Sequence, residues 1–179
     1  MIYLIRHGEA AASWGDHPDP GLSALGAKQA EAVAAQLNAF SITNIISSPM
    51  QRCRETSAPL SGLLSLTPTI AAQVSEIGTP PDVEDRVAWL QNLMAGTWTQ
   101  AGADLVAWRA NMGAFVDALP PQTAVFSHFV AINALCGLLE QDDRVTVFRP
   151  GHCSVTRLER RGGELRVAEY GSESATRVL

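Results

Sequence analysis

The sequence predicts an α/β fold: a three-layer sandwich in which a mainly parallel central sheet is flanked by helices, with a C-terminal antiparallel hairpin. Short apolar runs typical of buried strands alternate along the chain with longer segments that carry one apolar stripe at helical spacing. The last two strand-like segments instead alternate with a period of two around a pair of glycines, which indicates a hairpin.

The elements follow one another in the order that an alternating α/β fold requires. Buried strands are expected at residues 1–5, 42–46 and 123–126, and hairpin strands at 154–159 and 164–170. Residues 96–102 are expected to form a loop. A polar helix is expected from Gln51 until Pro59 interrupts it. The other expected helices each carry an apolar stripe, the first of them with Ser23 as its cap. In chain order, these stripes are Leu22, Leu25, Ala30, Val33 and Leu37; Val83, Val87, Leu90 and Met94; Leu105, Trp108, Met112, Phe115 and Leu119; and Ile132, Leu135 and Leu139.

Composition limits the classes of function. With 179 residues, 46% of them hydrophobic and 17% charged, the chain has the size and apolar content of one globular domain. A net charge of −5 argues against a general nucleic-acid or anionic-membrane binder, whose affinity rests on a basic surface. The apolar start ends at Arg6, and no later apolar run is long enough to span a membrane. We therefore expect a soluble, cytoplasmic protein that binds neither nucleic acid nor membranes.

Metal chemistry is not expected from the residue pattern. The three cysteines, Cys53, Cys136 and Cys153, lack metal-ligand spacing and are interpreted as reduced thiols. The four histidines are scattered, without an HExxH motif or a clustered set of carboxylates. We therefore assign no metal and no cofactor.

Charged side chains directly follow three of the predicted strands. Arg6 and His7 follow the first strand, Arg52 lies shortly after the second, and His128 follows the third. The carboxyl ends of parallel strands share one edge of a sheet, so two imidazoles and two guanidiniums are expected at one crevice. A guanidinium offers a planar fork of donors that matches a phosphate or a carboxylate. The sequence therefore predicts an anion site at this edge.

Three short motifs occur in a fixed order along the chain: Arg6-His7-Gly8-Glu9, Ser48-Pro49-x-x-Arg52 and Ser127-His128. In this order they resemble the histidine phosphatase superfamily, which also contains cofactor-dependent phosphoglycerate mutases. The segment 19–30 resembles the one that follows the family's first loop, and Val74-Ser75-Glu76 resembles its acid motif. The resemblance covers nearly the whole chain, so residues 1–179 are interpreted as a single domain of this type.

The resemblance implies a metal-independent phosphatase that hydrolyses small phosphate monoesters. His7 would be the nucleophile that becomes phosphohistidine, and Arg6 and Arg52 would clamp the phosphoryl oxygens. His128 would donate to those oxygens, protonated once the dianionic substrate is bound. Glu76 would be the acid that protonates the departing alcohol, with a pKa raised by enclosure in the site.

Other residues near these motifs are candidates for substrate contact. Ser13 is the nearest substitute for the polar residues that often follow the family's first motif, which are replaced here by Ala10-Ala11-Ala12. Phe129 stands where the family commonly has glycine and would add an apolar wall to the pocket. His152 precedes the last hairpin, where the family returns to the rim of the pocket.

Two alternatives to a monoesterase stay open. One is a phospholigand-binding module that keeps the clamp but has lost turnover. The other is a phosphohistidine protein phosphatase, which can dispense with the acid because imidazole leaves easily. Mutase activity is less favoured, since no Trp-Glu-Gly follows Glu76 and the first loop is short.

Overall fold

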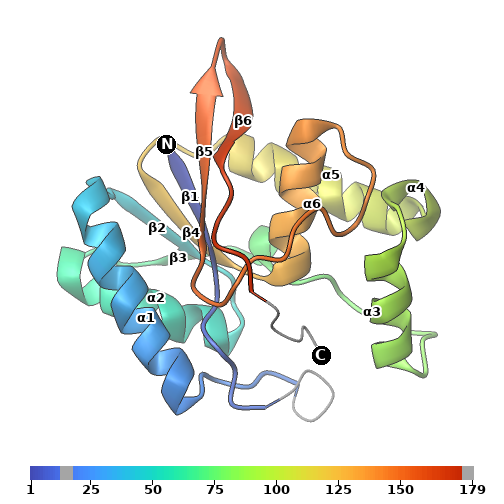
Figure 1. Ribbon diagram of the computed structural model, residues 1–179, viewed down its shortest axis with the longest axis horizontal. Helices are drawn as coiled ribbons and strands as arrows, with labels where there is room; N and C mark the ends of the chain where they lie inside the picture. The colour runs from blue at the N-terminus through green and yellow to red at the C-terminus, as the bar shows by residue number, and fades with distance from the viewer. Residues whose placement is uncertain (13–17, 175–179) are drawn as a thin grey trace.

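The computed structural model describes residues 1–12 and 18–174, and its centre is a six-stranded sheet (Figure 1). The strand order is β3-β2-β4-β1-β5-β6; neighbours from β3 to β1 are parallel, and β5 and β6 join antiparallel. The strands are β1 (Ile2–Arg6), β2 (Asn44–Ser47), β3 (Thr69–Ile70), β4 (Thr123–Ser127), β5 (Val155–Arg161) and β6 (Glu164–Glu169). The predicted mainly parallel sheet with a terminal antiparallel hairpin is confirmed.

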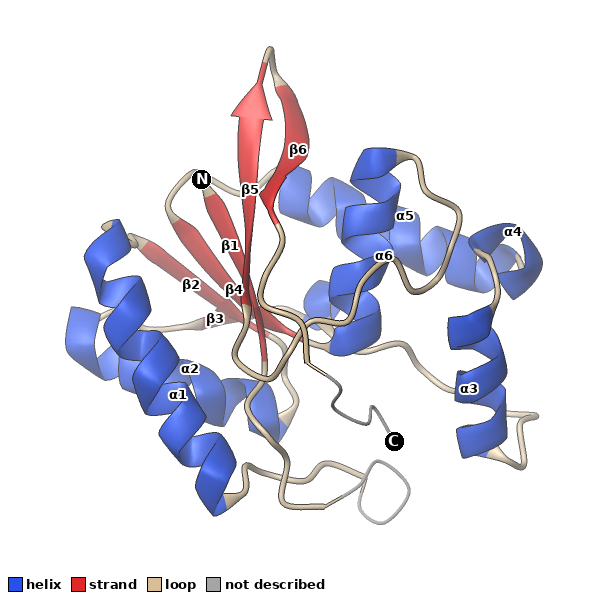
Figure 2. Ribbon diagram, in the orientation of Figure 1, coloured by secondary structure: helices blue, strands red, loops and turns tan. Residues whose placement is uncertain are grey.

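Helices cover both faces of the sheet, as Figure 2 shows. The helices α1 and α2 lie on one face and α5 and α6 on the other, with α3 and α4 farther out beside α5. Short 3₁₀ turns lie at Asn38–Phe40 and Ala72–Val74. The helices are α1 (Ala24–Leu37), α2 (Gln51–Leu64), α3 (Arg86–Ala95), α4 (Trp98–Ala101), α5 (Ala103–Asp117) and α6 (Phe129–Glu140). Within the described ranges, no helix is long and apolar enough to cross a membrane.

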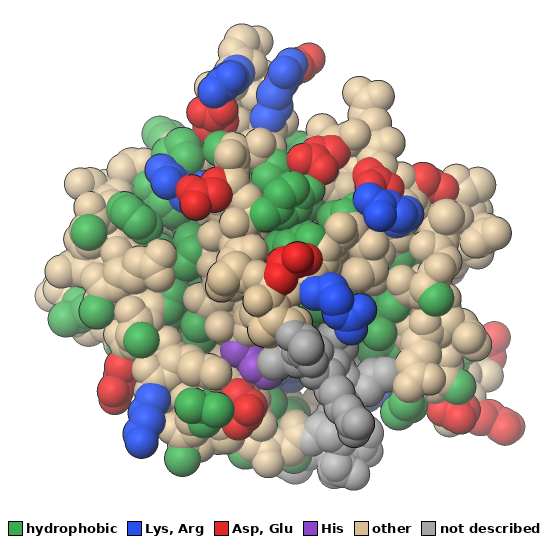
Figure 3. All heavy atoms as spheres, viewed as in Figure 1, with side chains coloured by type: hydrophobic (Ala, Val, Ile, Leu, Met, Phe, Trp, Pro, Cys, Tyr) green, Lys and Arg blue, Asp and Glu red, His purple; other side chains and the backbone are tan. Residues whose placement is uncertain are grey.

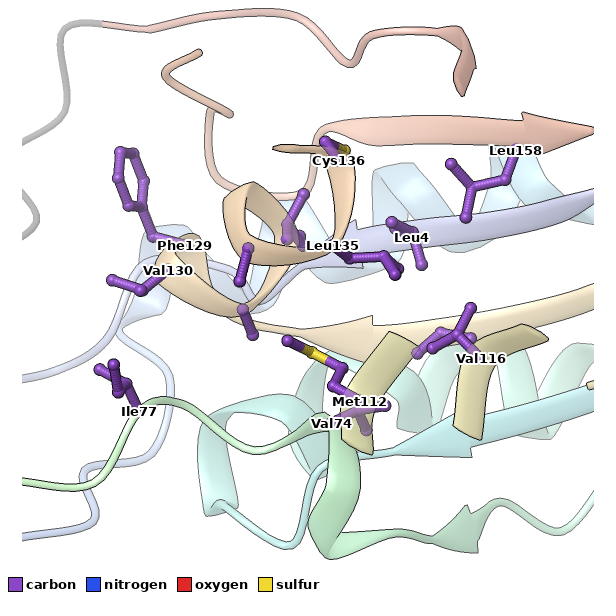
Figure 4. Close-up of a cluster of buried hydrophobic side chains, with 14 of the residues drawn as sticks. Leu4, Val74, Ile77, Met112, Val116, Phe129, Val130, Leu135, Cys136 and Leu158 are labelled. Atoms are coloured by element: carbon purple, nitrogen blue, oxygen red, sulfur yellow. The ribbon is translucent and has the colours of Figure 1, made fainter. Parts of the chain in front are cut away.

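The alternation of side chains along β1 creates two cores. Tyr3 and Ile5 join one buried cluster with residues of α1 and α2, whereas Ile2 and Leu4 join another with residues of α5 and α6. Figure 4 shows part of this second cluster. Because the central strands are buried on both faces, they are continuous apolar runs. The polar residues that follow each buried strand therefore lie at the edge of the sheet where the strand ends.

The structure corrects three expectations about the elements. Pro59 does not interrupt its helix: α2 runs on to Leu64, because the fully buried Leu60 and its neighbours pack into the first core and outweigh the missing backbone donor. Residues 96–102 are not all loop, since the buried Trp98 opens α4 and its backbone N–H donates to Asp143. The edge strand β3 was not predicted, because two exposed residues carry no periodic pattern.

Several predicted boundaries shift by two or three residues. The Ser23 cap is confirmed, with its hydroxyl accepting the N–H of Gly26 at 3.0 Å. The helix α3 begins at Arg86, after the Asp85 cap, which leaves Val83 outside it.

Candidate active site

The carboxyl ends of β1, β4 and β2 lie side by side and bring the three motifs together. Arg6 pairs with Ser127 in the sheet, and the N–H of His7 then donates to the Ser127 carbonyl at 3.0 Å. Ser48 makes the equivalent bond to Phe126, also at 3.0 Å. The rings of His7 and His128 consequently lie 5.3 Å apart between centroids. The predicted meeting of these residues at one edge is confirmed, and Figure 3 shows that histidine atoms reach this face of the molecule.

His7 is held as a neutral imidazole with a defined tautomer. Its Nδ1 lies 2.7 Å from the carbonyl oxygen of Gly8, and because a carbonyl can only accept, Nδ1 carries the proton. The lone pair is therefore on Nε2. Burial, and then the nearby guanidiniums of Arg52 and Arg6, lower the pKa of His7 well below its usual value. The ring is thus neutral at pH 7, with an unprotonated Nε2.

Gly8 is required by the close packing of the loop against α1. Its N–H donates to the hydroxyl of Thr56 at 3.0 Å, which ties the loop to α2. A Cβ at Gly8 would lie 2.7 Å from the carbonyl oxygen of Gly26, so the backbone of the loop can approach α1 only because this side chain is absent. This close approach fixes the carbonyl that orients His7.

The two arginines are buried at the site and differ in their partners. Arg6 donates to the Pro150 carbonyl at 2.8 Å and lies 5.3 Å from the centre of the Phe129 ring, and burial lowers its pKa to about 10. Arg52 is 4% exposed, and one of its terminal nitrogens lies 3.2 Å from Nδ1 of His128. Its other terminal nitrogen has no hydrogen-bond partner in the part of the chain that the structure describes and is 3.9 Å from the Asp19 carboxylate. That N–H group is available to an anion.

His128 is fully buried, which favours the neutral ring. Its Nε2 lies 2.8 Å from the hydroxyl of Ser48, while Nδ1 faces Arg52. Burial, followed by His7 and the two arginines, lowers the pKa of His128 well below its usual value. The protonated form expected for phosphate binding therefore needs the negative charge of a ligand.

Glu76 lies where the loop after the second 3₁₀ turn meets the N-terminus of α6. Its carboxylate accepts three backbone N–H groups, from Ile77 at 3.0 Å and from Val130 and Ala131 at 3.1 Å each. Burial nevertheless raises its pKa, against the opposing effect of these hydrogen bonds and of Arg52. Both of its oxygens are thus already engaged in capping the helix that His128 begins.

The substrate-contact candidates have different surroundings. His152 is partly buried with its ring centroid 6.0 Å from that of His7, and burial together with Arg6 lowers its pKa to about 4. Phe129 is 2% exposed, and its ring packs against Arg6, whose guanidinium lies 5.3 Å from the ring centre. Ser13 lies outside the described residues.

Three side chains that touch the site were not singled out as site residues from the sequence. Ser48 hydrogen-bonds His128, Thr56 holds Gly8, and the sulfur of Cys53 lies 3.3 Å from Nε2 of His128. Ser48 at least lies in a recognised motif, whereas nothing in the spacing of Cys53 or Thr56 distinguishes them from helix core residues. Among residues 1–12 and 18–174, no three or more His, Cys, Asp and Glu side chains are grouped so that they could hold a metal ion.

Comparison with known proteins agrees with this geometry. The family model for the histidine phosphatase superfamily (branch 1) matches residues 2–173. The chain is 32% identical over 112 residues to the uncharacterized protein Rv0525 of Mycobacterium tuberculosis, covering 60% of this chain and 51% of that protein. It thus spans about half the length of this curated relative.

Solved structures share the fold over almost the whole chain. A mycobacterial glucosyl-3-phosphoglycerate phosphatase superposes with a TM-score of 0.76 at 22% identity, covering 96% of this chain and 98% of that one. A phosphoserine phosphatase from Entamoeba histolytica, in complex with 3-phosphoglyceric acid, also gives 0.76, at 20% identity over 99% and 98% of the two chains. At this level of identity the likeness shows the fold.

Proposed function

The chain belongs to the histidine phosphatase superfamily, and from that premise we propose that it is a metal-independent phosphatase that hydrolyses small phosphate monoesters through a phosphohistidine on His7. The observation that carries this proposal is the hydrogen bond from Nδ1 of His7 to Gly8, which leaves the Nε2 lone pair for attack. Arginine and imidazole donors surround that nitrogen, as phosphoryl transfer requires.

In the first step, Nε2 of His7 attacks phosphorus in line. The P–N bond forms as the bond from phosphorus to the ester oxygen breaks, so the alcohol leaves. The free N–H of Arg52, together with Arg6 and His128, stabilises the charge on the three equatorial oxygens. The departing alkoxide takes a proton from Glu76 in its carboxylic acid form.

In the second step, water attacks the phosphohistidine. The Glu76 carboxylate accepts a proton from this water, the P–N bond breaks, and inorganic phosphate leaves with His7 restored. The raised pKa of Glu76 supports both roles, because a carboxyl group that is more readily protonated in the site than in water can give a proton and regain it.

One observation favours a second candidate, a phosphohistidine phosphatase. The three backbone N–H groups on Glu76 favour its ionised form and occupy both oxygens, which opposes its use as an acid. A phosphorylated imidazole is a good leaving group and needs no such acid.

Hydrolysis of an aryl phosphate in excess chelator tests the proposal. We expect turnover that resists the chelator and that His7→Ala abolishes. Absence of turnover in the native protein, together with phosphate-ester binding that Arg52→Ala removes, would instead indicate a phospholigand-binding module.

Glu76→Gln separates the two candidate substrates. Hydrolysis of an alkyl phosphate should fall by about 10²–10⁴-fold, whereas hydrolysis of a phosphohistidine peptide should survive. Glu84→Gln is the matched control, since Glu84 is an exposed carboxylate in the same segment. Equal rates of alkyl phosphate hydrolysis in Glu76→Gln and native protein would rule out Glu76 as the acid.

A further inference from the structure

A chain of buried hydrogen bonds lies behind His128. Arg52 contacts Nδ1 of His128 at 3.2 Å, and Nε2 contacts the Ser48 hydroxyl at 2.8 Å. The sulfur of Cys53 also lies 3.3 Å from Nε2 of His128, and its thiol donates to the carbonyl of Ser127 at 3.4 Å. Ser48, Cys53 and His128 are each 0% exposed, so no solvent competes for these bonds.

The chemistry of the two ends fixes the direction of every bond in this chain. A guanidinium can only donate, so Nδ1 of His128 must accept from Arg52. The Ser127 carbonyl can only accept, so the single thiol proton of Cys53 goes to it and is not donated to Nε2 of His128. The Ser48 oxygen then accepts the Nε2 proton of His128, and it also lies 3.3 Å from the backbone N–H of Met50.

We propose that Ser48, with Cys53 behind it, is a positioning residue that holds His128 as the Nε2–H tautomer, so that Nδ1 is the atom that binds the transferring phosphoryl group. This inference rests on the proposed function. When a phosphate dianion enters, the Arg52 donor turns from Nδ1 to a phosphoryl oxygen, and Nδ1 takes a proton from solvent water. Nδ1 then donates that proton in a hydrogen bond to the phosphoryl group, while the Ser48 oxygen still accepts from Nε2.

The charged and titratable groups around His128 explain why its protonated form depends on the hydrogen bond to Ser48. Arg6 and His7 face the ring from the end of β1, and Arg52 and Cys53 face it from α2. Glu76 caps the first turn of α6, where His128 is the N-cap residue. The arginines oppose a positive charge on the ring. An acceptor fixed on Nε2 therefore stabilises the imidazolium that the bound phosphate requires.

Nitrogen NMR of the protein labelled in its histidine rings tests the tautomer without any turnover. In the free protein His7 should show a protonated Nδ1 and His128 a protonated Nε2, with His7→Ala and His128→Gln used for assignment. Titration with inorganic phosphate should then protonate Nδ1 of His128. A free His128 protonated on Nδ1 would overturn the proposal.

Three serine variants test the positioning role. Ser48→Ala should lower kcat by about tenfold with little change in KM, and should move the basic limb of the kcat profile to lower pH by up to about one unit, because the imidazolium loses an acceptor. Ser48→Thr keeps a hydroxyl and should restore most of the shift. Ser57→Ala is the matched control, because Ser57 is equally buried in α2 but bonds only the Arg54 carbonyl. A basic limb that does not move in Ser48→Ala would overturn the positioning role.

The two possible failures are distinguishable. If the native protein hydrolyses no phosphate ester, the proposed function fails, but the phosphate titration followed by NMR still decides the inference. In that case Ser48→Ala should require a lower pH than native protein for phosphate to protonate Nδ1 of His128. Equal behaviour of the two proteins would contradict the role of Ser48.

Discussion

Acidification should destabilise this protein through His7 and His128. Burial, with the neighbouring guanidiniums, lowers the pKa of both imidazoles well below 6.5. Below pH 6.5 the unfolded chain therefore takes up protons on these rings that the folded protein does not. The free energy of unfolding must then increase with pH in this range and decrease on acidification.

The size of the effect follows from the number of protons. One proton of difference changes the free energy of unfolding by about 1.4 kcal/mol per pH unit, so two imidazoles give a limiting slope of about 2.7 kcal/mol per unit below pH 6. His152, whose pKa burial lowers from 6.5 to about 4, adds a slope of the same sign between those two pH values. Glu76 acts in the opposite sense: its raised pKa lets the folded state bind a proton before the unfolded state does as the pH falls. The slope expected for the native protein is positive.

Urea unfolding between about pH 7.5 and pH 5, in buffers free of phosphate, measures this slope. His128→Gln removes one titrating ring and should reduce the slope by about 1.4 kcal/mol per pH unit, whatever its effect at neutral pH. A native slope of zero, or an unchanged slope in the variant, would refute the reasoning, because the rings would then bind protons equally well in both states.

Four further substitutions test individual contacts. Arg52→Lys should lower kcat/KM for a phosphate ester by about 10²–10³-fold, because an ammonium lacks the planar fork; unchanged steady-state kinetics would contradict this. Arg109→Met should cost about 2–4 kcal/mol in urea unfolding, since it removes the donors that Arg109 supplies to the carbonyls of Ala134 at 3.0 Å and Asp142 at 2.9 Å; no loss would show that water replaces the guanidinium. Gly26→Ala should cost about 3 kcal/mol or more, because a Cβ there overlaps the Glu9 carbonyl, whereas Gly62→Ala, in open space on α2, should stabilise by up to about 1 kcal/mol. Thermal shifts of the same sign would contradict the last pair.

The fold and the meeting of the site residues could be predicted because both depend on local pattern. The apolar runs before His7 and His128 mark buried strands, and parallel strands place their ends at one edge. Helix continuity through Pro59 could not be predicted in this way. It depends on the packing of Leu60 in a core whose other members are distant in sequence.

The sequence did not show which neighbours the side chains around the site contact. The sequence could not show that Phe129 packs on Arg6, a contact that arises because its position at the first turn of α6 directs the ring toward the end of β1. The capping of α6 by Glu76 joins residues more than fifty positions apart, so no motif spacing reveals it. The contact of Cys53 with His128 depends in the same way on how α2 packs beneath β4.

The most direct test of the central claim is to trap the phosphoenzyme. Native protein mixed with an aryl phosphate and quenched rapidly without acid should carry one phosphoryl group, and peptide mass spectrometry should locate it on His7. His7→Ala should carry none. A native protein that turns over substrate with no phosphoryl group on His7, or a His7→Ala variant that still turns over, would contradict the account.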